Sequence, residues 1–93
     1  MAITDRSGTI TTGGAAQVLM AANVARNSFS VQNNSAVELW VNELGATALA
    51  SQPSIKIAPG VTYESPYGMM PVFAISIFGV VTGQAFSARE WQW

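Results

Sequence analysis

The chain has 93 residues, of which 49% are hydrophobic and only 10% are charged, and its formal net charge is −1. It contains neither cysteine nor histidine, which excludes disulfides and metal sites built on thiolate or imidazole. The length allows one domain. Because its four cationic residues are scattered singly, no basic stripe exists to bind a phosphate backbone, and we expect no nucleic acid among its partners.

The longest apolar run, residues 69–81, is too short to span a bilayer and is interrupted by Pro71, Ser76 and Gly79. The N-terminal residues lack the apolar core of a secretory signal. We therefore expect a protein made in the cytoplasm, with no membrane partner. Typical domains carry about 25% charged residues, so the surface must be covered by uncharged polar side chains or by other chains. We expect both.

Residues 1–7 carry little apolar content and are predicted to form a flexible or partner-docked arm ahead of a domain over residues 8–93. The β-branched residues 8–12 and the apolar residues 17–20 predict two short strands. Helix formers occur at 15–25, but no good cap precedes them, so a strand followed by a loop is favoured over a helix.

Residues 29–42 show the clearest pattern, two alternating runs around Asn33-Asn34-Ser35. This predicts a β-hairpin with one buried face. The residues expected to face the core are Phe29, Val31, Leu39 and Val41; those expected to face outward are Ser28, Ser30, Gln32, Glu38, Trp40 and Asn42.

Residues 43–53 predict a long connection, and residues 54–64 a second hairpin around a type II turn at Pro59-Gly60. In that hairpin Ile55 and Ile57 are expected to face inward. A loop over 65–71 follows. The last two predicted strands cover 73–78, with Phe73, Ile75 and Ile77 on one face, and 84–90, with Phe86 and Ala88 opposite Ser87 and Arg89.

Seven to eight short strands, regular turn signals and no convincing helix predict an all-β fold. The expected architecture is a single antiparallel β-sandwich or jelly-roll-like barrel.

Catalysis is not predicted. General acid–base catalysis most often uses histidine, which the chain lacks. The serines and threonines have no partner base that could activate them as nucleophiles. The carboxylates are Asp5, Glu38, Glu43, Glu64 and Glu90. Glu38 and Glu43, near Trp40, are interpreted as solvated residues on an exposed strand face. They are not clustered enough for calcium, and no phosphate loop follows Gly13-Gly14, so we expect no metal or cofactor.

The large side chains outside the predicted core are candidates for an interface: Trp40, Tyr67, Met69, Met70, Arg89, Trp91 and Trp93. Exposed tryptophans can stack on carbohydrate or on a single-stranded base. Packing against other subunits is favoured, because interfaces are enriched in Trp, Tyr, Met and Arg. The loop carrying Tyr67, Met69 and Met70 is interpreted as an interface finger or as a lid over the core.

Three motifs carry a resemblance to a known family: F-x-x-Q-N at residues 29–33, P-G-x-x-Y-E at 59–64 and T-G-Q-x-F at 82–86. With the sequence around them, from Gly8 to Trp91, they resemble small all-β proteins encoded among the virion genes of tailed bacteriophages and prophages. The resemblance implies a virion structural component, either a capsid decoration (cement) protein or an accessory part of a neck, tail or fibre.

Two hypotheses follow. In the first, copies associate as dimers or trimers and bind the major capsid protein at the capsid surface. In the second, the protein is a tail, neck or fibre module whose Trp40 contacts host glycans.

Overall fold

The computed structural model of the protein describes residues 2–66 and 71–93. This part of the chain contains nine β-strands and no helix, which confirms the all-β prediction. The strands are β1 (Ala2–Asp5), β2 (Gly8–Thr9), β3 (Gln17–Met20), β4 (Arg26–Asn33), β5 (Leu39–Asn42), β6 (Ile55–Ile57), β7 (Thr62–Glu64), β8 (Ile75–Gly79) and β9 (Ala85–Gln92). Within the described residues, nothing forms a helix that could cross a membrane.

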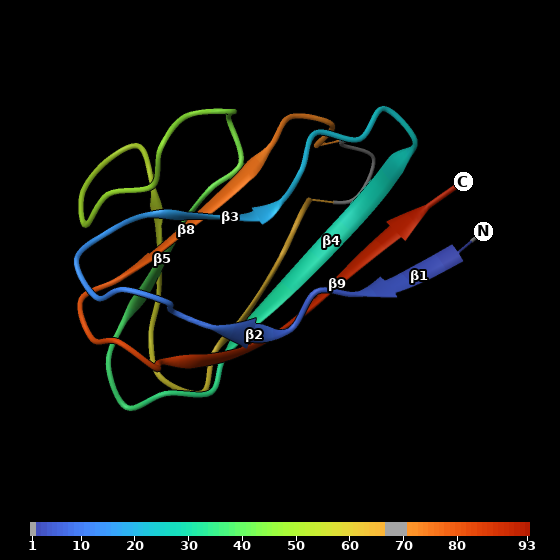
Figure 1. Ribbon diagram of the computed structural model, residues 1–93. Coiled ribbons are helices and arrows are strands. Elements are labelled where there is room, and N and C mark those ends of the chain that lie inside the picture. The colour runs from blue at the N-terminus through green and yellow to red at the C-terminus, as the bar shows by residue number, and fades with distance from the viewer. Residues whose placement is uncertain (1, 67–70) are drawn as a thin grey trace.

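The strands form two antiparallel sheets (Figure 1). In the first, here called the β9 sheet, the order is β1-β9-β4-β7, and β2 also pairs with β9. In the second, the β8 sheet, the order is β3-β8-β5-β6. The two longest strands, β4 and β9, run side by side, and Ala2 is the register partner of Gln92, so the two chain ends lie together.

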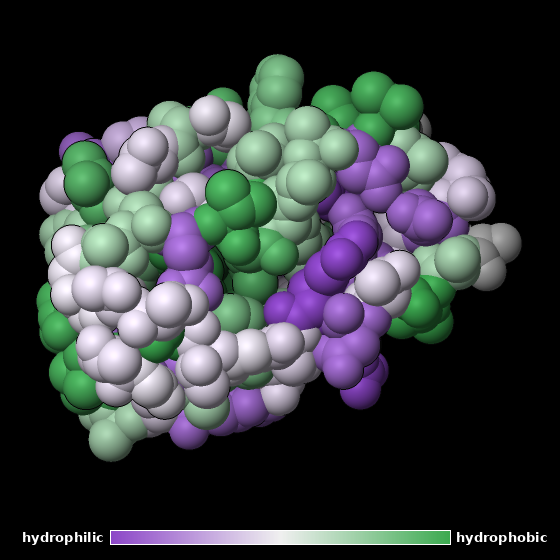
Figure 2. Space-filling view, viewed as in Figure 1, coloured by the Kyte–Doolittle hydropathy of each residue, from purple (hydrophilic) through white to green (hydrophobic). Residues whose placement is uncertain are grey.

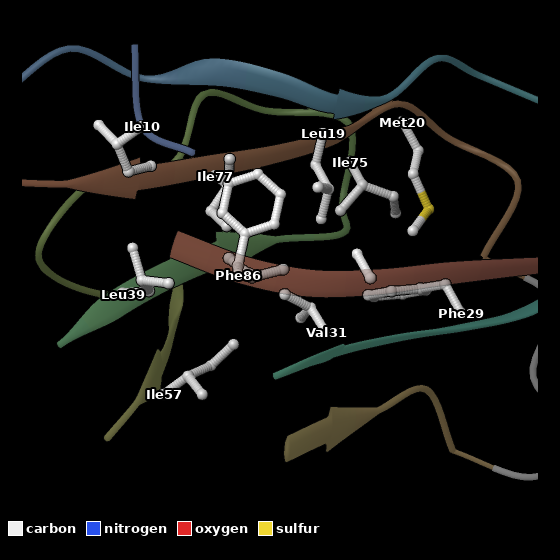
Figure 3. Packing of buried hydrophobic residues seen from close by; sticks show 12 residues of the cluster. Ile10, Leu19, Met20, Phe29, Val31, Leu39, Ile57, Ile75, Ile77 and Phe86 are labelled. Atoms are coloured by element: carbon white, nitrogen blue, oxygen red, sulfur yellow. The ribbon is translucent and has the colours of Figure 1, made fainter. Parts of the chain in front are cut away.

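The core lies between the sheets and is built from alternate residues of both. Phe29 and Val31 on β4 are almost fully buried, as are Ile75 and Ile77 on β8 (Figure 3). Each such side chain contributes about 1.5–3 kcal/mol by leaving water. The inward residues expected for β4, β5 and β9 are confirmed, because Leu39, Val41, Phe86 and Ala88 are also buried.

The predicted hairpin over residues 29–42 is wrong. Its two strands lie in different sheets: β4 pairs with β9 and β7, whereas β5 pairs with β8 and β6. The connection between them crosses from one sheet to the other, held by the Asn33 side chain, whose amide donates to the carbonyls of Val37 and Ile57. Alternation with a buried face is satisfied equally by a hairpin and by two strands on opposite sides of one core.

The second predicted hairpin is wrong for the same reason. Its type II turn has the expected geometry, since the Val61 amide donates to the Ala58 carbonyl at 3.0 Å and Gly60 has a φ of +80°. The turn nevertheless carries the chain from β6 in the β8 sheet to β7 in the β9 sheet. Turn chemistry therefore specified the local backbone and not the strand partner.

The prediction of an N-terminal arm is wrong for residues 2–5. Residues 2–5 do not form a separate arm but strand β1, which pairs with β9 along its whole length. Residues 15–25 contain strand β3 and then a loop, as expected, and residues 43–53 form the predicted strand-free connection.

Three single residues differ from their predicted faces. Phe73 lies ahead of β8 and is 60% exposed, and Ile55 at the start of β6 is 40% exposed. Asn42, expected to face solvent, is buried. Its register partner is Ser76, whose hydroxyl accepts a hydrogen bond from the buried Ala48 amide, so the 43–53 connection folds back over this end of the β8 sheet.

Candidate interaction surfaces

A buried ion pair joins β4 to β9 at the end of the molecule where the chain termini lie. Arg26 and Glu90 are both about 1% exposed or less, and Arg26 Nε donates to Glu90 Oε2 at 2.7 Å. The remaining Arg26 nitrogens donate to the backbone carbonyls of Pro71, Phe73 and Ala21. One side chain therefore binds two strands and two loops together.

Two further residues complete the environment of Glu90. Arg6 Nη2 lies 2.9 Å from Oε1, and Asn23 donates to Oε2 at 3.3 Å. Burial alone would raise the pKa of Glu90, but the hydrogen bonds from Arg6, Arg26 and Asn23 outweigh it and hold the pKa below its ordinary value. Both carboxylate oxygens are thus occupied by the protein's own donors, and the cluster supports the fold rather than presenting a site to a ligand.

This cluster was not predicted from the sequence, although the inward position of Glu90 could have been inferred from alternation along the last strand. Glu90 shares its parity with Phe86 and Ala88, which places it on the inward face. Arg26 is different: a register shift between Arg26 and Ser28 changes the parity of β4, so alternation counted back from Phe29 does not reach it.

A second polar contact links the two sheets along one side. Tyr63 on β7 packs against Phe29 with ring centroids 5.8 Å apart, and its hydroxyl donates to Glu43 Oε1 at 2.6 Å. Burial, together with the Glu43 carboxylate, raises the pKa of Tyr63 well above its ordinary value. Glu43 was expected to be solvated; instead it is partly buried and tied to the opposite sheet. Glu38 is exposed, as expected.

The predicted interface residues do not form one patch. Arg89 and Trp91 lie on the outer face of the β9 sheet, whereas Trp40 lies on the outer face of the β8 sheet. Trp93 follows β9 and is 67% exposed. Tyr67, Met69 and Met70 lie outside the described residues.

The outer face of the β9 sheet is hollowed over its β7, β4 and β9 strands. The depression has a volume of about 380 Å³. Its side chains alternate with the core residues: Ser30 and Gln32 from β4, Thr62 and Glu64 from β7, and Ser87, Arg89 and Trp91 from β9. The serines are short and are flanked by longer side chains, which accounts for the hollow.

Register arranges these side chains in rows. Ser30 lies directly between Glu64 and Arg89, and Asp5 lies on the far side of Arg89. Hydrogen bonds from Ser7, with a contribution from Arg89, hold the pKa of Asp5 below its ordinary value. One anionic group, Glu64, and one cationic group, Arg89, therefore line the depression, and Asp5 lies next to Arg89 outside it. The sequence predicts that Ser30 and Arg89 face outward, but it could not show that they lie on adjacent strands or that Glu64 lies beside them.

The outer face of the β8 sheet has a different composition. Trp40 is half-buried between its register partners Phe78 and Lys56. Around this sheet, on its strands and adjoining loops, large apolar side chains are exposed: Val18, Leu44, Leu49, Ile55, Val80 and Val81. On the face that it displays, Figure 2 shows a hydrophilic band near β1 and β9, and apolar residues interspersed with near-neutral ones over the part that contains β3, β5 and β8.

Within the described residues no three or more carboxylates gather into a group that could hold a metal ion. No known protein family, curated protein or solved structure matches this chain.

Proposed function

We propose that the protein is a virion structural protein of tailed bacteriophages or prophages, and that it acts as a capsid decoration (cement) protein. The resemblance of its three motifs to small virion proteins supports this origin. The observation that carries an assembly role is the exposure of six large apolar residues on the strands and adjoining loops of the β8 sheet, whose outer face also carries Trp40. Covering such a surface with another protein removes exposed apolar side chains from water, which is favourable for a chain with only 10% charged residues.

The proposed mechanism is mass action. A protein that binds the assembled shell and not its dissociated subunits stabilises the shell by the free energy of binding. The partner is the major capsid protein, contacted non-covalently through the β8 face, and copies of the chain associate as dimers or trimers on the capsid surface. The role requires no catalysis and no cofactor.

The fold we propose is a jelly roll. When β1 and β2 are counted as one strand, each sheet has four strands and the chain alternates between the sheets at all but one connection after β2. A double sheet of eight strands is the jelly-roll arrangement, which occurs in viral capsid domains. This likeness in strand order is an analogy at the level of fold and supports the virion role only to that extent.

The test is reconstitution on heads from which the protein has been removed. We expect that adding the purified protein restores heat resistance and that Trp40→Ser weakens its binding to heads. Arg89→Ala, on the opposite outer face, serves as the control and should bind normally. Equal heat resistance of heads with and without the protein would overturn the cement role.

Copy number separates this role from the alternative that the resemblance also implies. Hundreds of copies per particle are expected for a decoration protein, as against around six or a dozen for an accessory part of a neck, tail or fibre. Quantitative mass spectrometry of intact particles measures this number directly.

A further inference from the structure

The depression on the outer face of the β9 sheet combines one aromatic ring with uncommitted polar groups. Trp91 lies at one end, where it lines the hollow while half-buried. The neighbouring Gln32, Glu64 and Arg89 are exposed, and among the described residues their side chains make no hydrogen bond or ion pair. Their donors and acceptors are therefore available to a ligand.

The size and the spacing of these groups restrict the ligand. The depression has a volume of about 380 Å³, is lined mostly by polar groups and is open to solvent, so it would seat a small polar ligand on the surface rather than enclose it. Glu64 and Arg89 lie on either side of Ser30 on the central strand. Their backbones are therefore separated by two strand spacings of about 4.8 Å each. A ligand seated over Ser30 would donate to the carboxylate on one side and accept from the guanidinium on the other.

The charges restrict it further. The lining contains one carboxylate, Glu64, and one guanidinium, Arg89, and Asp5 lies beside Arg89 on its other side, so the site has no net positive potential to hold an anion. A phosphate, a nucleic acid or an acidic sugar is therefore disfavoured. A neutral molecule with several hydroxyl groups and an apolar face matches both the polar groups and the indole.

We propose that this depression is a binding site for a neutral carbohydrate, one face of a sugar ring packing on Trp91 while its hydroxyls bind Glu64, Arg89 and Gln32. The proposal is independent of the virion role and concerns the opposite sheet from the proposed capsid contact. It also places the carbohydrate on a face other than that of Trp40, the residue that the sequence suggested for glycan contact.

The test is an array of neutral and acidic glycans probed with the purified full chain, followed by calorimetric titration of the best neutral binder. We expect binding to neutral glycans, and about a tenfold loss of affinity for Trp91→Ala and for Arg89→Ala. Trp40→Ala on the other sheet is the matched control and should bind unchanged. Because Trp91 is half-buried, Arg89→Ala provides a variant at an exposed position.

Each other outcome overturns the proposal. Absence of binding to any neutral glycan excludes the site, and binding restricted to acidic glycans contradicts the charge argument. Loss of binding in Trp40→Ala, with Arg89→Ala unaffected, would move the site to the β8 sheet. Head binding by the same variants is measured separately, so a failed carbohydrate site and a failed cement role give different results.

Discussion

The outer faces of the two sheets arise from the same alternating pattern but have different chemistry. On the β9 sheet, Ser30, Ser87 and their neighbours form a polar hollow bordered by Trp91. On the β8 sheet, Trp40 lies between Phe78 and Lys56, and large apolar residues are exposed on the strands and adjoining loops of that sheet. The outer face of the β9 sheet also carries large apolar residues, Ile3 and its register partner Trp91, beside its polar side chains. More large apolar side chains are exposed on the strands and adjoining loops of the β8 sheet, and this distribution is the basis of the proposed contact with another protein there.

The faces are also supported differently from within. Behind Arg89 and Trp91, the inward side of β9 carries Glu90 in its buried contact with Arg26. Behind Trp40, the inward side of β5 carries only the apolar Leu39 and Val41. Both sheets are held by apolar packing, and the β9 sheet is held by the buried charged cluster as well. Four predictions separate these contributions.

The largest effect is expected from Glu90→Gln. The substitution leaves the buried Arg26 guanidinium without a counter-charge, and removing one partner of a buried pair costs about 3–5 kcal/mol of unfolding free energy. Denaturant unfolding measures the loss. The same substitution at the exposed Glu38 is the control and should change stability by less than about 0.5 kcal/mol. Similar losses in both variants would show that the cluster does not stabilise the fold.

A smaller loss is expected from Tyr63→Phe, which removes the hydroxyl that joins β7 to Glu43, the residue that follows β5 of the opposite sheet. The partly buried carboxylate is then short of a donor, at a cost of about 1–3 kcal/mol. A double-mutant cycle with Glu43→Gln isolates the contact. A coupling energy near zero would mean that the hydroxyl does not link the sheets.

Acid should reproduce part of the Glu90→Gln effect. Because the pKa of Glu90 is lowered in the folded protein, its stabilisation is complete above the ordinary value of 4.5 and is lost as the pH falls through the folded-state pKa. Unfolding free energies measured from about pH 7 to about pH 3 should converge for the wild type and Glu90→Gln. Parallel curves would contradict the assignment.

The smallest effect is expected at the exposed charges of the two outer faces. Arg89→Ala and Lys56→Ala should each change unfolding free energy by less than about 0.5 kcal/mol, because neither side chain is buried. Thermal and denaturant unfolding measure this. A larger loss for Arg89→Ala would mean that the border of the depression is needed for folding, and that its effect on ligand binding is indirect.

Much of the fold was readable from alternation alone. Alternation predicts that Phe29, Val31, Leu39 and Val41 face the core, and all four are buried. Alternation predicts less of the candidate surfaces. Arg89 and Trp91 were found by parity, but Ser30 and Glu64 acquire a role only through their positions beside Arg89 across the sheet.

The sequence by itself determined the all-β class, the inward face of each long strand and the Pro59-Gly60 turn, because side-chain period and turn chemistry are local properties. Only the tertiary structure decided that residues 29–42 cross between sheets instead of forming a hairpin. It likewise brought Arg26 to Glu90 and assembled the depression from three strands. The physical reason is that alternation specifies which face of a strand is buried, whereas the choice of neighbouring strand depends on contacts between residues far apart in the chain.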